Sequence, residues 1–172
     1  MMDSPASILR RIRIALILFI IGLVLSGVTA FPLLWELSIL GRLLGVDPTE
    51  PTAYGDGLRF WIALVWRGLD DTYADYPFIA YGTDWLAFAH LMIALFFVPV
   101  YRDPQRYRAN LVCGIAACAS VIPLALICGL LREIPFYWRL IDCSFGIVGV
   151  IPLFYALRLT ARLPSSATVL RA

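Results

Sequence analysis

The stretch YGTDWLAFAHLMIALFFVPVY, residues 81–101, decides the fold class. From Trp85 onward it is apolar, and with its polar start it supplies about the 20 residues that a helix needs to cross the hydrocarbon layer of a membrane. Only a helix satisfies its own backbone hydrogen bonds in that layer. The stretch therefore predicts a membrane-spanning helix over residues 84–101, with Thr83 or Asp84 as the cap that binds the first free amides.

The composition of the whole chain agrees with a membrane location. Of its 172 residues, 61% are hydrophobic and only 15% are charged, whereas a soluble domain has about 25% charged residues. Three further apolar runs are long enough to cross a membrane, at residues 14–34, 109–131 and 138–159. We expect an all-α polytopic membrane protein, a bundle of four transmembrane helices in a single membrane domain over residues 1–163, followed by a disordered tail at 164–172.

The arginines predict the orientation of the spans, and the chain has no lysine. They cluster before the first span, between the second and third, and after the fourth, where the positive-inside rule places the cytoplasm. Both termini should therefore be cytoplasmic, in what we expect to be the inner (plasma) membrane of a bacterium. The start also resembles a secretory signal ending near Ala30, but its apolar run continues to Leu34, which favours a retained helix.

The first outer loop, residues 35–83, is expected to carry short helices at the membrane surface. Pro32 should end the first span, and the leucine-rich segment 33–44 then predicts a short helix along the bilayer. The segment LRFWIALVWRGLDD, residues 58–71, predicts a second interfacial helix. Its arginines and Asp70 share one stripe, and its tryptophans suit headgroup depth.

Small residues indicate where the spans should pack against each other. Gly22, Ser26 and Ala30 recur at every fourth position of the first span, and Gly146 and Gly149 lie in the last span. Small side chains let two helix backbones approach closely inside a membrane. We interpret both sets as helix-packing faces.

Six ionisable residues lie toward the outer half of the predicted spans: Asp84, His90, Arg132, Glu133, Arg139 and Asp142. Ionisable groups within spans are rare and often functional, so these six form a candidate polar cluster. Asp84 and His90 lie about 120° apart around their helix at 100° per residue, so a partner for His90 must come from another helix. The structural alternative pairs Arg139 with Asp142, Arg132 with Glu133 or Asp84, and His90 with a backbone carbonyl.

The sequence predicts no metal site and no cofactor. It has one histidine and no HExxH or CxxCH motif, and the acidic segment DDTYAD, residues 70–75, lacks the spacing and the glycine of a calcium loop. The four cysteines include no CxxC motif, which disfavours a thiol oxidoreductase. Cys128 and Cys143 fall near the outer ends of adjacent spans, where they can pair or remain free.

Three segments resemble a set of uncharacterised bacterial four-span integral membrane proteins: SGVTAFPL (26–33), YPFIAYGTDWLAFAH (76–90) and IPFYWRLIDCSFGIVGVIPL (134–153). The resemblance implies the four-span topology. It brings no known activity, ligand or functional residue.

Three functions from different classes fit these observations. The first is a non-catalytic accessory, assembly or scaffold subunit that contacts lipids and either a membrane protein partner or further copies of itself. The second is a small proton-coupled transporter or channel that uses Asp84, His90 and Asp142. The third is an enzyme acting on a lipid or quinone, with His90 as general base and Arg132 or Arg139 holding an anionic group, but no nucleophile is evident. A net charge of +2 gives no reason to expect a nucleic-acid partner.

Overall fold

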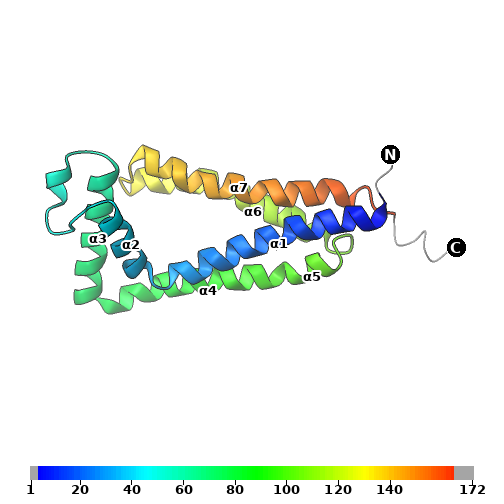
Figure 1. Ribbon diagram of the computed structural model, residues 1–172, viewed down its shortest axis with the longest axis horizontal. Helices are drawn as coiled ribbons and strands as arrows, with labels where there is room; N and C mark the ends of the chain where they lie inside the picture. The colour runs from blue at the N-terminus through cyan, green and yellow to red at the C-terminus, as the bar shows by residue number, and fades with distance from the viewer. Residues whose placement is uncertain (1–3, 165–172) are drawn as a thin grey trace. The chain divides into compact units, whose positions relative to one another are not determined.

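The computed structural model describes residues 4–164, and in this part of the chain every regular element is a helix (Figure 1). Four helical segments there are long and apolar enough to cross a membrane: Pro5–Ala30, Pro77–Arg102, Arg108–Leu131 and Phe136–Thr160. The predicted all-α class with four membrane-spanning helices is therefore confirmed. The elements are α1 (Pro5–Ala30), α2 (Leu33–Leu43), η1 (Pro51–Tyr54), α3 (Leu58–Asp75), η2 (Pro77–Ile79), α4 (Ala80–Phe96), α5 (Val98–Arg102), α6 (Arg108–Leu131) and α7 (Phe136–Thr160), the two η elements being short 3₁₀ helices.

The first two spans differ from their predicted bounds. The first helix begins at Pro5, well before residue 14, and it includes the segment ahead of the apolar run. It ends at Ala30 because Pro32 follows, and Pro32 is the N-cap residue of α2, which begins at Leu33. The other two predicted spans, 109–131 and 138–159, agree with α6 and α7 to within two residues.

The predicted cap of the second span is wrong. The helix α4 already begins at Ala80, so Thr83 and Asp84 lie inside its first turns and not ahead of them. The Thr83 hydroxyl donates instead to the carbonyl of Ala80, at 2.7 Å. This span also ends in two parts, since Pro99 has no N–H and its ring clashes with the carbonyl four residues earlier, which separates α4 from α5 at Phe97.

Internal contacts divide the chain into two units, Met1–Gly22 with Ala94–Ala172, and Leu23–Ile93. In the first unit, α6 and α7 form an antiparallel hairpin. A Cβ on Gly146 would lie 2.5 Å from the carbonyl oxygen of Cys118, and one on Gly149 would lie 2.8 Å from the Cys118 sulfur. Larger side chains at these two positions would therefore force the hairpin apart.

The remaining core of the first unit lies around Phe97. Its ring packs edge to face against Phe19, with centroids 4.8 Å apart. A Cβ on Gly114 would lie 2.7 Å from the Phe97 ring and 2.9 Å from Leu153, which is fully buried. The start of α1 joins this core through Ile12, which is also fully buried. The beginning of α1 therefore belongs to the packed core of the first unit.

Two contacts link the chain segments at one end of the first unit. The Arg13 guanidinium lies 5.5 Å from the centre of the Tyr101 ring, which joins α1 to α5. The Gln105 side chain donates to the carbonyl of Pro164, at 2.9 Å, which joins the turn before α6 to the segment after α7. The predicted disordered tail, 164–172, lies outside the described residues except for Pro164.

In the second unit, α2 and α3 pack through a glycine. A Cβ on Gly41 would lie 2.5 Å from two ring carbons of Trp66, so the indole lies directly on the α2 backbone. Ile62 and Ala63 of α3 are almost fully buried in this unit. The predicted helices at 33–44 and 58–71 are therefore present, and the second extends to Asp75.

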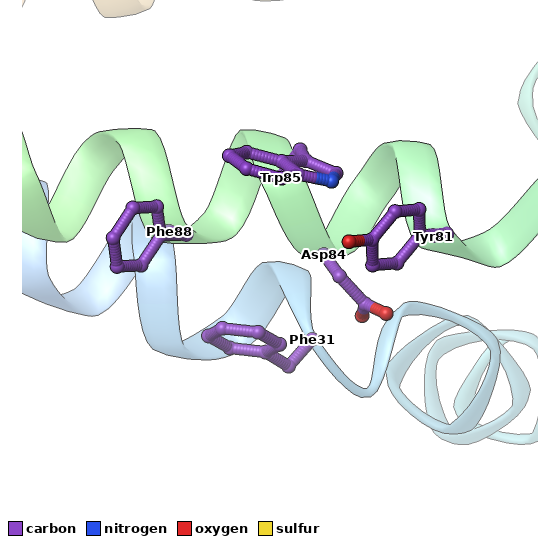
Figure 2. A pocket seen from close by; sticks show the side chains of 5 residues that line it. All are labelled: Phe31, Tyr81, Asp84, Trp85 and Phe88. Carbon is purple, nitrogen blue, oxygen red and sulfur yellow. The ribbon is translucent and has the colours of Figure 1, made fainter.

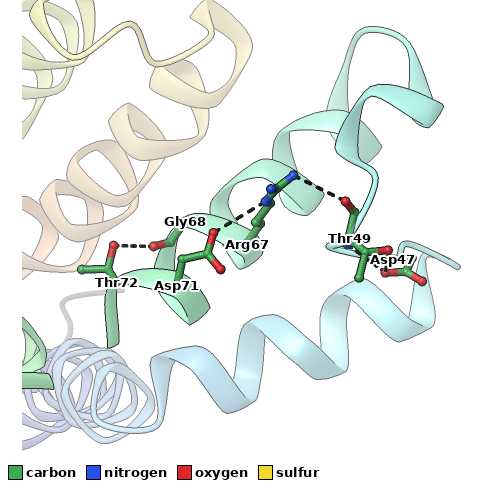
Figure 3. A network of polar contacts seen from close by, with 6 residues as sticks. All are labelled: Asp47, Thr49, Arg67, Gly68, Asp71 and Thr72. Atoms are coloured by element: carbon green, nitrogen blue, oxygen red, sulfur yellow. Dashed lines mark hydrogen bonds and ion pairs between the residues drawn. The ribbon is translucent and has the colours of Figure 1, made fainter. Parts of the chain in front are cut away.

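Arginines of α3 bind the loop that connects it to α2. The Arg59 guanidinium donates to the carbonyl of Gly45 at 2.7 Å and lies over the Tyr54 ring. Figure 3 shows Arg67 between the carbonyl of Thr49, at 3.4 Å, and Asp71, at 3.6 Å. The Arg67–Asp71 pair is solvent-exposed and adds little to stability, but the stripe of arginines on α3 fixes the loop.

Two helices end in the same backbone motif. After α2, the N–H of Gly45 donates to Arg42 and the N–H of Val46 donates to Gly41. After α6, the N–H of Glu133 donates to Leu130 and the N–H of Ile134 donates to Gly129. Both are Schellman caps, which require a left-handed residue just past the helix. Gly45 takes that position with φ +64°, and Glu133 takes it with φ +57°.

Candidate functional site

An open hollow in the second unit depends on a close approach of α1 and α4. A Cβ on Gly27 would lie 2.9 Å from the carbonyl oxygen of Ala87, and Ala87 is fully buried. Because residues four apart lie on the same side of a helix, this contact carries Phe31, just past the end of α1, toward α4. The side chains of Tyr81, Trp85 and Phe88 lie on α4 at helical spacing.

These residues and Asp84 line an open hollow of about 290 Å³. Figure 2 shows Phe31 on one side, Trp85 opposite it, Phe88 at one end, and Tyr81 with the Asp84 carboxylate at the other. The rings on α4 stand edge to face. The Tyr81 and Trp85 centroids are 5.8 Å apart at 81°, and those of Trp85 and Phe88 are 6.1 Å apart at 89°. Each of the four rings is about half exposed, so ring faces are accessible from the hollow.

Within the second unit, the carboxylate of Asp84 has no protein partner. It makes neither a hydrogen bond nor an ion pair with any described residue of that unit, and it is partly buried. Its position in the first turns of α4 puts it near the positive end of the helix dipole. A charged group of this kind in apolar surroundings also favours an external cation.

His90 lies near the middle of the same span, six residues after Asp84. Its Nδ1 lies 2.8 Å from the carbonyl oxygen of Leu86, one turn earlier in α4. A carbonyl can only accept, so Nδ1 donates, and in the neutral ring the proton therefore resides on Nδ1 and leaves Nε2 with a lone pair. The structural alternative for this residue, a bond to a backbone carbonyl, is thus the arrangement observed.

The other four members of the predicted polar cluster lie in the first unit. Arg132 and Glu133 are exposed in the turn between α6 and α7. The Arg139 side chain packs on Gly129, and its guanidinium lies 5.3 Å from the centre of the Phe136 ring. Within the described part of this unit, neither Arg139 with Asp142 nor Arg132 with Glu133 forms an ion pair. The ion pairs of the structural alternative are therefore absent from this end of the hairpin.

The predicted packing residues differ in what surrounds them. Gly146 and Gly149 lie against Cys118, as described above. On the first span the close approach occurs at Gly27. A Cβ on Gly22 would meet no described atom within 4 Å, and Ser26 is exposed.

The cysteines and acidic residues form no further site in the described chain. All four cysteines are free, so Cys128 and Cys143 do not form a disulfide. The buried thiol of Cys143 lies 3.9 Å from the carbonyl oxygen of Ile122. No group of three His, Cys, Asp or Glu side chains within residues 4–164 is arranged to hold a metal ion.

Sequence reasoning missed the four aromatic residues of the hollow. The spacing of Tyr81, Trp85 and Phe88 is a signal that the sequence does contain, since residues four and three apart share a helix face. Phe31 has no such local signal, because it comes from another helix. Comparisons of this chain with protein-family models, with curated proteins and with solved structures gave no match.

Proposed function

We propose that the protein is a multi-pass protein of the bacterial inner membrane that works as a non-catalytic accessory, assembly or scaffold subunit. The observation that carries this proposal is the set of contacts that its ionisable side chains make. His90 uses its Nδ1 on its own helix, and in the first unit Arg139 packs on Gly129 and Phe136. Neither arrangement places a nucleophile beside a base, as covalent catalysis by side chains requires.

The small-residue contacts support the same proposal. Glycines at positions 27, 41, 114, 146 and 149 each lie against a neighbouring helix. These contacts turn large apolar side chains outward, among them Phe145, Val148 and Ile151 of α7. Outward apolar faces on membrane helices contact either lipid or another membrane protein, as an accessory subunit requires.

For the orientation, we propose that both termini face the cytoplasm. The contacts of Arg13 with Tyr101 and of Gln105 with Pro164 bring three chain segments together at one end of the first unit. These are the segments that carry the three predicted cytoplasmic arginine clusters, so a single side of the membrane accounts for all of them.

The experiment that tests the proposal is extraction of a tagged full-length chain from its own membranes in a mild detergent, followed by measurement of the mass and composition of the complex. We expect a stoichiometric membrane protein partner or a defined homo-oligomer. His90→Ala should leave the abundance and the partner unchanged. A monomer with no partner, or loss of the partner in His90→Ala with the fold intact, would count against a scaffold.

A proton-coupled transporter or channel is the second candidate, and the orientation of His90 favours it. With Nδ1 donating to Leu86, the free lone pair on Nε2 can take up a proton in the middle of the span. The test is proton flux into proteoliposomes that contain the purified chain. His90→Ala should abolish any flux, and an unchanged flux would exclude His90 as a carrier.

A further inference from the structure

The hollow between α1 and α4 has a carboxylate and aromatic rings that no cationic side chain of the second unit contacts. Elsewhere in the described chain, five arginines lie over aromatic rings, at Tyr54, Tyr101, Tyr107, Phe136 and Phe154. Within the second unit, no arginine lies over Phe31, Tyr81, Trp85 or Phe88. In that unit these four rings therefore have no cationic side chain on them.

Four rings with a carboxylate at one end have the chemistry that recognises a substituted ammonium group. A cation is attracted to the negative face of an aromatic ring within about 6 Å of its centre, and several rings together form the aromatic cages that bind quaternary ammonium. Tyr81, Trp85 and Phe88 pack edge to face, so the planes of successive rings are nearly perpendicular. Together they form an angled wall of the hollow. Asp84, at one end of this wall, supplies the counter-charge.

The size and position of the hollow indicate a lipid headgroup. Its volume of about 290 Å³ is at the lower limit of small-molecule sites, which run from about 300 to 1,000 Å³, so it fits a headgroup and not a whole lipid. It lies beside the first half of α4, toward one end of the span Pro77–Arg102, and tyrosine and tryptophan at such a position anchor a helix at headgroup depth. The hollow is open, so the acyl chains of a bound lipid can remain in the bilayer.

We propose that this hollow binds the ammonium headgroup of a phospholipid, with Asp84 as the counter-ion and Phe31, Tyr81, Trp85 and Phe88 as the walls. The phospholipids with this chemistry carry ethanolamine or choline. All these headgroups contain a phosphate, but an anionic glycerol headgroup has no ammonium to offset the repulsion between that phosphate and Asp84, which is unfavourable. The proposal does not depend on a partner subunit, and a chain that proves to be a lone monomer can still bind lipid here.

The test is native mass spectrometry of the full-length chain in detergent, titrated separately with phosphatidylethanolamine, phosphatidylcholine and phosphatidylglycerol of identical acyl chains. We expect retention of one ethanolamine or choline lipid per chain, preferred over the glycerol lipid. Asp84→Asn keeps the size of the side chain and removes the charge, and Trp85→Leu removes the largest wall. Each should reduce retention roughly tenfold, as loss of a charge-assisted contact or a cation–π contact implies.

Two control variants show whether a loss of lipid retention is specific to the hollow or follows from removing any carboxylate or any exposed ring. Glu133→Gln removes an exposed carboxylate in the α6–α7 turn, and Phe78→Leu removes an exposed ring that does not line the hollow. Both should retain lipid as the wild type does.

Equal retention of all three lipids, or full retention by Asp84→Asn and Trp85→Leu, would overturn the proposal. A parallel titration with tetramethylammonium chloride and with ethanolamine tests the soluble source of the same chemistry. If these amines bind at micromolar concentration and displace the lipid, the ligand is a soluble amine and the assignment to a lipid is wrong. If Asp84→Asn does not fold, Trp85→Leu alone decides the outcome.

Discussion

Replacing Glu133 by glycine tests whether the left-handed residue of the α6–α7 turn is strained. The turn has the same Schellman hydrogen bonds as the end of α2, where glycine occupies the equivalent position. Glutamate has a Cβ that crowds the backbone in this conformation, and glycine does not. We therefore expect Glu133→Gly to stabilise the protein and Gly45→Ala to destabilise it.

The magnitude follows from two opposing effects. A left-handed residue with a Cβ costs about 1–2 kcal/mol relative to glycine. Glycine makes the unfolded chain more flexible, which offsets about 0.4–1 kcal/mol of that gain. The net change in the free energy of unfolding should be about 0.5–1 kcal/mol, positive for Glu133→Gly and negative for Gly45→Ala. In a chain of this length that corresponds to about 2–4 °C per kcal/mol in Tm.

The assay is thermal unfolding in one detergent, followed by helical circular dichroism. Glu133→Gln is the matched control, because it keeps the backbone strain and removes the charge, and its Tm should stay near that of the wild type. A new Cβ at position 45 meets only the Arg59 guanidinium, at 3.5 Å, so a steric clash does not explain the loss there. The reasoning is refuted if Glu133→Gly lowers Tm, or if Glu133→Gln raises it as much as Glu133→Gly does.

Three further changes test the packing and the loop. Gly146→Ala should destabilise the α6–α7 hairpin by about 1–3 kcal/mol, since its Cβ would meet the carbonyl of Cys118. Gly22→Ala, which meets nothing within 4 Å, should not lower Tm, and equal losses in the two variants would contradict this account. Gly41→Ala should destabilise the α2–α3 contact by a similar amount, unless Trp66 can swing aside, which a shift in tryptophan fluorescence at unchanged Tm would reveal. The Asp47 carboxylate accepts from the N–H and the hydroxyl of Thr49, both at 2.8 Å, and these bonds lower its pKa. Because the unfolded chain then binds the proton more readily, this contribution to stability is present above the ordinary aspartate pKa and is lost as the pH falls through the lowered one. Asp47→Asn should remove that part of the pH dependence of Tm, and an unchanged acid limb would argue against it.

The spans could be predicted from the sequence because length and apolarity are local properties. An uninterrupted apolar run of about 20 residues fixes the existence of a span, and prolines such as Pro32 and Pro135 fix where helices end or begin. The start of α1 could not be predicted this way. Ile8 and Ile12 are buried, but the arginines around them interrupt the apolar run, so a helix that packs with one side only is missed.

The candidate site depends on contacts between segments far apart in the sequence. The repeat of Gly22, Ser26 and Ala30 marks a small-residue face, but it does not say which small residue meets α4, and the contact is made by Gly27. That one-residue choice rotates α1 and carries Phe31 to Trp85. The arginine stripe of α3 is visible in the sequence, but no local pattern shows that Arg59 and Arg67 bind the preceding loop.

The hairpin of α6 and α7 subjects the two sides of α7 to different kinds of selection. On the inner side, volume is restricted, since Gly146 and Gly149 leave no room for an added carbon beside Cys118. On the outer side, at Phe145, Val148 and Ile151, any apolar side chain can face lipid, whatever its shape. In a saturation mutagenesis scan of α7, the substitutions that are tolerated should therefore alternate with the helical repeat. Large side chains should be excluded from the inner face, and only charged side chains from the outer face.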